Sequence, residues 1–120
     1  MKKGRLTRNS EFKRLFSRGK RAENKSLTLF FLNNGYTFNR LAVVVKKREI
    51  GGAVLRNKAR RRIKEAYRNL EREGKLYSGY DIMIMAKKGV AELDYGGIYK
   101  ELTQALVQGG LLIVPGNSKS

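Results

Sequence analysis

The sequence has no cysteine, histidine or tryptophan among its 120 residues, and only one proline. Without cysteine there is no disulfide, no thiolate zinc site and no thiol nucleophile. Without histidine the chain also lacks the usual proton shuttle at neutral pH and the commonest nitrogen ligand of metals. These absences exclude most of the hydrolytic mechanisms that a single small protein could carry by itself.

Acidic residues are also scarce, with 10 Asp plus Glu against 27 Lys plus Arg. Asp81 and Asp94 are the only aspartates, and no pair of carboxylates has a spacing that suggests a two-metal site. We therefore expect this chain to be poorly equipped to cut a phosphodiester bond alone. Any chemistry in which it takes part is expected to be performed by another molecule.

Long apolar runs are absent as well, and none approaches the roughly 18–20 residues of a membrane-spanning helix. The charged start Met1–Arg5 is not followed by the apolar segment of a secretory signal. We expect a cytoplasmic protein with no membrane partner. The length suits one domain, predicted over residues 1–110, with a C-terminal tail at 111–120.

Positive charge is what the sequence has in excess, with a formal net charge of +17. It is concentrated in two segments: residues 1–25 carry a net +8 and residues 40–68 a net +9, whereas residues 69–120 are neutral. Such a field attracts polyanions in a salt-dependent way. This distribution favours a nucleic acid as the partner, ahead of an anionic membrane surface.

The hydrophobic pattern predicts an α+β fold, a two-layer sandwich of a small mixed sheet with three helices. The first helix is expected at 6–18, capped by Asn9 or Ser10 and ended by Gly19. Segments 26–32 and 40–45 are predicted to pair as a hairpin around a loop at 33–39. The further predictions are a basic connection at 46–52, a helix at 53–72 closed by Gly74, a strand at 80–86, a loop at 87–89 and a helix at 94–107.

The helix at 53–72 divides into two faces when its residues are placed at 100° per residue. The predicted buried stripe consists of Leu55, Ala59, Ile63, Ala66 and Leu70. The predicted cationic face consists of Arg60, Lys64, Asn57, Arg68 and Arg61, with Lys58 and Arg62 beyond the stripe and Arg56 at its edge. Arginine suits phosphate because its planar fork donates two parallel hydrogen bonds. From these residues alone, a generic basic helix that binds any RNA or DNA is an open alternative.

The same segment, Ala53-x-x-Arg56-Asn57-Lys58-x-Arg60-Arg61-x-Ile63-Lys64, resembles the RNR signature of the protein component of bacterial ribonuclease P. Companion motifs stand in the family's order: Arg5-Leu6, then Glu11-Phe12-x-x-Leu15-Phe16-x-x-Gly19, then Arg40 to Lys47, then Tyr80 to Gly89. Together they cover most of residues 5–108. The resemblance implies the family's α+β sandwich, including a left-handed βαβ crossover.

The resemblance also implies a function: a protein subunit that assists a catalytic RNA in removing the 5′ leader of precursor tRNA. It implies a 1:1 ribonucleoprotein with a monomeric protein, magnesium bound mainly by RNA, and a lowered magnesium requirement. The residues it implies for binding the RNA subunit are Arg56, Asn57, Lys58, Arg60, Arg61, Lys64 and Arg68. Those it implies for the leader, in a cleft between the first helix and the sheet, are Phe12, Phe16, Phe30, Lys46 and Lys47.

One alternative for the aromatic residues and three rival functions stay open. Phe12 and Phe16, at i and i+4 beside Leu15, also fit ordinary core contacts, and Phe31 should face the opposite side of the sheet from Phe30. A general or ribosomal RNA-binding protein would share the charge and the basic helix. A nuclease acting alone and a helix that reads duplex DNA are the other rival functions.

Overall fold

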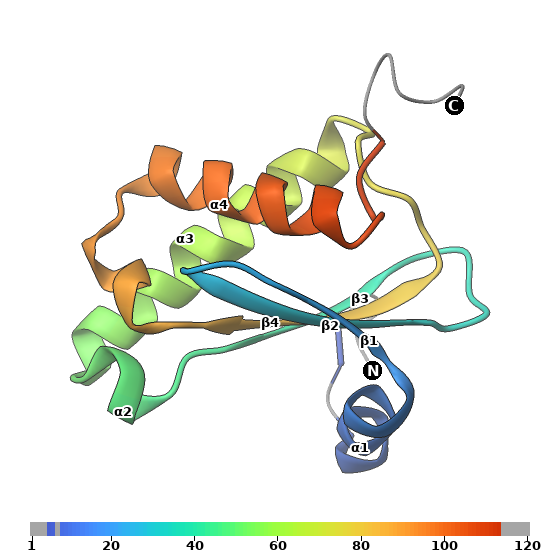
Figure 1. Ribbon diagram of the computed structural model, residues 1–120, viewed down its shortest axis with the longest axis horizontal. Helices are drawn as coiled ribbons and strands as arrows, with labels where there is room; N and C mark the ends of the chain where they lie inside the picture. Colours follow the sequence, from blue (N-terminus) through green and yellow to red (C-terminus); the bar gives the residue numbers. More distant parts are fainter. Residues whose placement is uncertain (1–4, 7, 114–120) are drawn as a thin grey trace.

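A four-stranded mixed sheet organises the protein in the computed structural model, which describes residues 5, 6 and 8–113. Its strands are β1 (Lys20–Glu23), β2 (Leu27–Asn33), β3 (Arg40–Val44) and β4 (Tyr80–Ala86). Their order across the sheet is β1-β2-β4-β3 (Figure 1). The strand β4 is antiparallel to β2 and parallel to β3. The predicted α+β class and mixed sheet are therefore confirmed.

The predicted hairpin between the second and third strands is wrong, because β4 lies between them. The strand β4 has three consecutive buried apolar residues, Ile82, Met83 and Ile84, and so needs cover on both faces. A strand of this composition is most stable in the middle of a sheet. The loop at 33–39 accordingly crosses the end of β4, where the Asn34 N–H donates to the Gly79 carbonyl at 2.8 Å.

Four α-helices and one 3-10 helix accompany the sheet in the described residues. They are α1 (Asn9–Arg18), α2 (Lys47–Ile50), α3 (Ala53–Arg72), the 3-10 helix η1 (Lys88–Glu92) and α4 (Tyr95–Gln108). The short elements β1, α2 and η1 were not predicted; α2 lies in the expected basic connection, and η1 follows β4. The chain passes from β3 to β4 through α2 and α3, and the left hand of this crossover remains an expectation from the resemblance.

The two faces of the sheet are covered unequally, with α3 and α4 on one face and α1 on the other (Figure 1). Phe31, on the face of α3 and α4, belongs to the main core. Phe30, its neighbour on β2, belongs to a smaller cluster built around Leu6, Leu15 and Met83 beneath α1. The predicted opposition of Phe30 and Phe31 is confirmed. Much of the α1 face is only half-buried, which leaves apolar surface accessible beside the helix.

The first helix begins later than expected and is capped differently. Its N-cap is Arg8, so the predicted caps Asn9 and Ser10 lie inside the helix. Glu11 replaces them: its Oε1 accepts the Arg8 N–H at 3.1 Å, the acidic half of a capping box. Gly19 ends the helix as predicted, and its N–H donates to the Leu15 carbonyl at 2.9 Å.

The long helix α3 follows its predicted bounds, and Gly74 closes it in a left-handed conformation with φ of 70°. Four of the five predicted core positions are buried, but Leu55 is 46% exposed. The first turn of α3, from Ala53 to Leu55, is exposed throughout, which is why the stripe fails there. Tyr67 is buried instead and bonds through its hydroxyl to Asn39.

The C-terminal part of the described chain returns to the main core. Leu111 and Leu112, where we expected the tail to begin, are buried there, and Leu112 forms a bridge with Leu76. The Ile113 N–H donates to the Lys75 carbonyl at 2.7 Å. The rest of the predicted tail, 114–120, lies outside the described residues. Among the described helices, none is long and apolar enough to cross a membrane.

Candidate nucleic-acid interface

A row of cations runs along α3 where the helix meets the edge of the sheet. Arg60, Lys64 and Arg68 follow each other at intervals of four residues, so they share one side of the helix. All three line a groove of about 490 Å³, to which β3 contributes Leu41, Ala42 and Val43 and the N-terminal segment contributes Arg5. A second hollow of about 340 Å³ lies on the other side of the row, where Arg61 and Arg72 join Lys64 and Arg68.

Within this row, the surroundings of Lys64 shift its pKa. Burial lowers the pKa of its ammonium group, and the nearby charges of Arg5, Arg68 and Arg60 lower it further. Four of the five charged residues that line the groove are cations, with Glu71 as the one carboxylate, and these cations repel each other unless a further anion comes between them. The groove is therefore suited to an anion such as a phosphate of a nucleic-acid backbone.

Some predicted RNA-binding residues of α3 are already used inside the protein. The Arg56 guanidinium folds back and donates to the carbonyl of Gly51, just before the helix begins. Arg62, which we placed beyond the stripe, donates to the Leu93 carbonyl at 2.8 Å and joins α3 to the segment before α4. The Asn57 Oδ1 accepts from Arg60 Nη1 at 2.8 Å. Lys58 and Arg61 are exposed.

The predicted leader-binding aromatics meet on the opposite face of the sheet. Phe16 of α1 and Phe30 of β2 lie edge to face, with ring centroids 5.0 Å apart. The guanidinium of Arg21 on β1 lies 5.6 Å from the centroid of Phe30. Phe16 is 54% exposed, which rules out a plain core role, whereas Phe12 is half-buried against the Leu6–Leu15–Met83 cluster. The structure thus brings two of the three aromatics together at an accessible surface.

A basic groove continues this face at the far end of the strands. Residues Thr28, Val44 and Met85 stand two positions along from Phe30, Ala42 and Met83 in the paired strands, so they share a face with Phe30. They line a groove of about 490 Å³. Its cations are Lys25, Lys46, Arg48, Lys87 and Lys88. Lys47, predicted beside Lys46, is the exposed first residue of α2 and is not part of this lining.

Sequence reasoning therefore missed Lys25, Arg48, Lys87 and Lys88 as groove residues. Lys87 and Lys88 directly follow the buried strand β4, a position that could have indicated the end of the same face. Lys87 also has internal partners, since its ammonium donates to the Asn24 carbonyl at 2.7 Å and pairs with Glu23. The sequence does not indicate a groove position for Lys25, because the residue stands in a turn before β2. The face of the sheet to which such a turn residue belongs depends on how the whole sheet is arranged.

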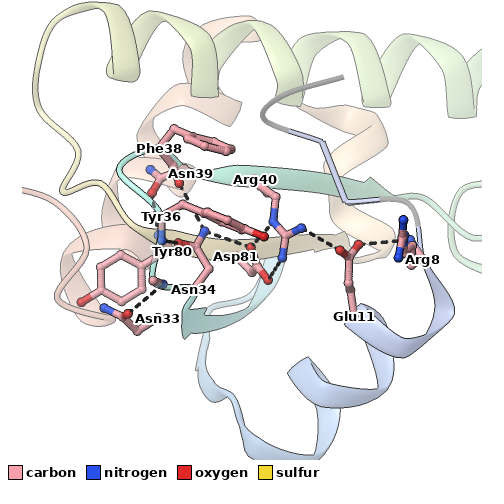
Figure 2. A network of polar contacts seen from close by, with 11 residues as sticks. Arg8, Glu11, Asn33, Asn34, Tyr36, Phe38, Asn39, Arg40, Tyr80 and Asp81 are labelled. Atoms are coloured by element: carbon pink, nitrogen blue, oxygen red, sulfur yellow. Dashed lines mark hydrogen bonds and ion pairs between the residues drawn. The ribbon is translucent and has the colours of Figure 1, made fainter. Parts of the chain in front are cut away.

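A buried ion-pair network joins the sheet to the start of α1 (Figure 2). Asp81, only 1% exposed, accepts two hydrogen bonds from Arg40, from Nε at 2.7 Å and from Nη2 at 2.8 Å. The third guanidinium nitrogen of Arg40 donates to Glu11 Oε2 at 2.6 Å. The amide of Asn34 donates to Asp81 at 3.0 Å, and the ring of Tyr36 lies 5.0 Å from the guanidinium carbon. These hydrogen bonds and charges raise the pKa of Arg40, which keeps its positive charge.

These surfaces present exposed cations and accessible aromatic rings. Within residues 5, 6 and 8–113, no three carboxylates gather as they would around a metal ion. The most buried carboxylate, that of Asp81, has both oxygens bonded to Arg40. The described residues thus carry two separate cationic surfaces, one on α3 and one at the end of the sheet face that α1 partly covers.

Known proteins resemble this chain over nearly its whole length. The "Ribonuclease P protein component" of Clostridium botulinum is 39% identical over 112 residues, which cover 92% of this chain and 98% of the relative. That of Clostridioides difficile is 35% identical over 97 residues, covering 81% and 83%.

Solved structures agree with the sequence comparison. The Staphylococcus aureus RNase P protein superimposes with a TM-score of 0.81 at 26% identity, over 92% of this chain and 98% of that one. The Thermotoga maritima RNase P protein gives 0.75 at 29% identity, over 85% and 94%. The Ribonuclease P family model matches residues 1–109. The chain therefore belongs to the ribonuclease P protein family.

Proposed function

We propose that this protein is the RNA-binding subunit of ribonuclease P and helps a catalytic RNA remove the 5′ leader of precursor tRNA by endonucleolytic cleavage. The observation that carries this proposal is the separation of the arginine row on α3 from the accessible rings beside α1 and the basic groove that continues their face of the sheet. One surface would serve a permanent RNA partner, and the other a single-stranded substrate. A protein that binds only one RNA would need only one of them.

The α3 surface is assigned to the backbone of the catalytic RNA. Five cations of this surface reach solvent or line the grooves: Lys58, Arg60, Arg61, Lys64 and Arg68. Phosphate is the ligand that such a row of cations fits. Asn57 holds Arg60 at its position. Arg56, bonded to the Gly51 carbonyl, would act mainly by fixing the start of the helix, with a weaker direct contact.

The α1 surface is assigned to the leader. The accessible rings of Phe16 and Phe30, backed by half-buried Phe12, offer stacking for unpaired bases with little sequence preference. Each base stacked in this way contributes about 1–3 kcal/mol. Lys46, in the groove at the end of the same face, and Lys47, exposed beside it, would neutralise leader phosphates.

The chemistry is assigned to the RNA. Magnesium ions at the cleavage site would be held mainly by RNA and substrate phosphates, because the described carboxylates of this chain do not converge. The protein would lower the magnesium requirement by supplying fixed positive charge to the same phosphates. Its own net charge of +17 opposes self-association, so we propose one monomer per RNA subunit in the cytoplasm.

The test is a reconstitution with 5′-labelled precursor tRNA and a bacterial ribonuclease P RNA at low magnesium, with and without this protein. We expect cleavage at the mature 5′ end only when both protein and RNA are present. Binding of both RNAs without restored cleavage would indicate a general RNA-binding protein instead. Cleavage by the protein without added RNA would contradict the assignment of chemistry to the RNA.

A further inference from the structure

We propose that Glu11 is a positioning residue for substrate: through Arg40 and Asp81 it fixes α1 on the sheet and thereby holds the ring of Phe16 against that of Phe30. The inference rests on the proposed leader-binding function and names a residue outside the ring pair of Phe16 and Phe30. What Glu11 sets is the relative position of the two rings, not the charge around them.

The contacts that run from Asp81 through Arg40 to Glu11 start from a rigid part of the sheet. Asp81 is buried in the inner strand β4 and accepts two hydrogen bonds, a bidentate pair, from Arg40 on the neighbouring strand β3. Because a paired fork fixes the plane of the guanidinium, the direction of its remaining nitrogen is also fixed. That nitrogen, Nη1, points to Glu11 in the first turn of α1, at 2.6 Å. The chain of contacts thus transmits the position of the sheet to the helix.

The helix needs such a constraint, because its apolar attachment is narrow. Within α1 only Leu15 is fully buried, and Phe16 remains 54% exposed. Leu15 and the half-buried Phe12 hold the helix by non-directional apolar contacts with one small cluster, whereas the hydrogen bond from Arg40 to Glu11 has a fixed direction and an anchor in the sheet. Glu11 precedes Phe16 by five residues, which is about 7.5 Å along a helix. A rigid helix therefore carries the placement of Glu11 to the ring of Phe16.

A role in stability alone is the competing explanation, and the choice of variant separates the two. Glu11→Gln keeps one side-chain oxygen, which still accepts the Arg8 N–H, so the cap of α1 is retained. Its amide group would face the Arg40 guanidinium with a donor instead of an acceptor, which breaks the contact to Nη1. Arg40→Ala is unsuitable, because it would leave the buried carboxylate of Asp81 without its charged partner.

Glu92→Gln supplies the matched control. Glu92 is exposed at the end of η1, and its replacement changes the net charge by the same amount as Glu11→Gln. Any general gain in RNA affinity from a lost negative charge will therefore appear in both variants. Phe16→Ala and the double variant with Glu11→Gln complete the set.

The measurement is the affinity of the protein, assembled with a bacterial ribonuclease P RNA, for precursor tRNA with its leader and for the same tRNA without a leader. The ratio of the two affinities reports the leader contact, and the affinity of the protein for the RNA subunit is measured separately. We expect Glu11→Gln to lower the ratio by about threefold or more, a coupling usual for groups in one network. Affinity for the RNA subunit and for leaderless tRNA should match that of Glu92→Gln.

The double variant gives the decisive reading. If Glu11 acts through Phe16, adding Glu11→Gln to Phe16→Ala will lower the ratio little further than Phe16→Ala does alone. Fully additive losses would overturn the proposal, as would an unchanged ratio in Glu11→Gln while Phe16→Ala lowers it; in both cases leader binding itself stands. If Phe16→Ala also leaves the ratio unchanged, the leader-binding function is what fails, and the positioning role falls with it.

Discussion

At the scale of single residues, the arginines of this protein divide into two groups by what their side chains touch. Arg40, Arg56 and Arg62 donate to acceptors within the protein, and their loss would be felt by the fold. Arg61 and Arg68 are exposed beside grooves, and their loss would be felt by a partner. Residue type alone therefore does not separate RNA contacts from structural ones; the structural arginines bond to a buried carboxylate or a backbone carbonyl, whereas Arg60 bonds only to the exposed Asn57 side chain among the contacts described.

Replacing Arg60 and Arg61 together by Ala should weaken binding to the catalytic RNA and flatten its salt dependence. Each lost phosphate contact lowers the slope of log K against log salt by about 1. Binding titrations at several salt concentrations measure the slope. Arg62→Ala is the matched control: it removes one charge from the same helix, but its side chain bonds to Leu93, so it should lower stability more than the slope. An unchanged slope in the double variant would refute the assignment of this face.

Phe16→Ala should weaken binding of precursor tRNA that has a leader, while mature tRNA binds as before. The exposed ring contributes little to folding, and its stacking on a base is worth about 1–3 kcal/mol. Phe31→Ala is the contrasting change, because that ring is buried in the main core and its removal costs about 3–5 kcal/mol of stability. Binding assays with both tRNA forms, next to thermal melts, separate the two effects. Equal losses for both tRNA forms with Phe16→Ala would contradict the leader contact.

Tyr67→Phe should lower the free energy of unfolding at pH 7 by about 0.5–1.5 kcal/mol, the usual net value of one hydrogen bond. The lost bond is the one to Asn39 Nδ2 at 3.1 Å. Burial raises the pKa of the Tyr67 hydroxyl well above its ordinary value of 10.0. The native state therefore keeps a proton that the unfolded state releases, and stability falls as pH rises above about 10. Denaturant melts between pH 8 and about 11 should show a shallower loss in the variant than in the parent protein.

At the scale of helices and strands, the sequence predicts the elements that are long enough to show a hydrophobic pattern. The α3 helix and the β4 strand match their predicted bounds, because a twenty-residue amphipathic period defines the helix and a continuous apolar run defines the strand. The four-residue elements β1 and α2 were missed, since so few residues define no period. The hairpin prediction failed for a different reason: strand order depends on which strand must be covered on both faces, and that is a property of the whole sheet.

The candidate site was likewise predictable only in part. The row of Arg60, Lys64 and Arg68 was predictable, because the helical period alone places them on one side. At the end of the sheet Lys46 was predicted, but its companions Lys25, Lys87 and Lys88 were missed, because they come from separate turns that only the register of β2, β3 and β4 brings together. The contact from Arg40 to Glu11 was also out of reach, since it spans 29 residues and depends on where α1 lies.

Gly19→Ala should destabilise the junction of α1 and β1. A Cβ at this position would lie 2.5 Å from the Leu15 carbonyl oxygen and 3.0 Å from that of Phe31, both backbone atoms that cannot rotate away. Overpacking of this kind costs about 1–3 kcal/mol. Gly89→Ala, where an added Cβ meets nothing within 4 Å, is the control and should change stability by less than about 0.5 kcal/mol. Similar melting temperatures for the two variants would show that the close approach at Gly19 is relieved at no cost.

At the scale of the whole molecule, the charge of +17 stabilises complexes and destabilises the free protein. Burial lowers the pKa of Lys64 most, and repulsion from Arg5, Arg68 and Arg60 in the α3 groove lowers it further. An anion that occupies this groove relieves the repulsion and binds only the folded state, so it raises the stability of that state. Partner binding and protein stability are therefore linked through the same side chains.

Sulfate should raise the melting temperature more than chloride does at equal ionic strength. A stabilisation of about 1 kcal/mol corresponds to roughly 4–8 °C for a domain near this size. Lys64→Gln should melt higher than the parent protein in chloride, because one repelling charge is gone, and it should gain less from sulfate. Thermal scans in both salts provide the measurement. The same gain from sulfate in both proteins would place the anion elsewhere.

The position of β4 has a consequence for the order of events during synthesis. It is the last strand to leave the ribosome, yet β2 and β3 both pair with it and not with each other. Until residue 86 has emerged, β3 lacks its strand partner, and the fork of Arg40 lacks Asp81. The cationic helix α3 is by then already synthesised. The nascent chain therefore presents its most basic segment before it has a complete sheet, and the final fold is reached only after most of the molecule has been made.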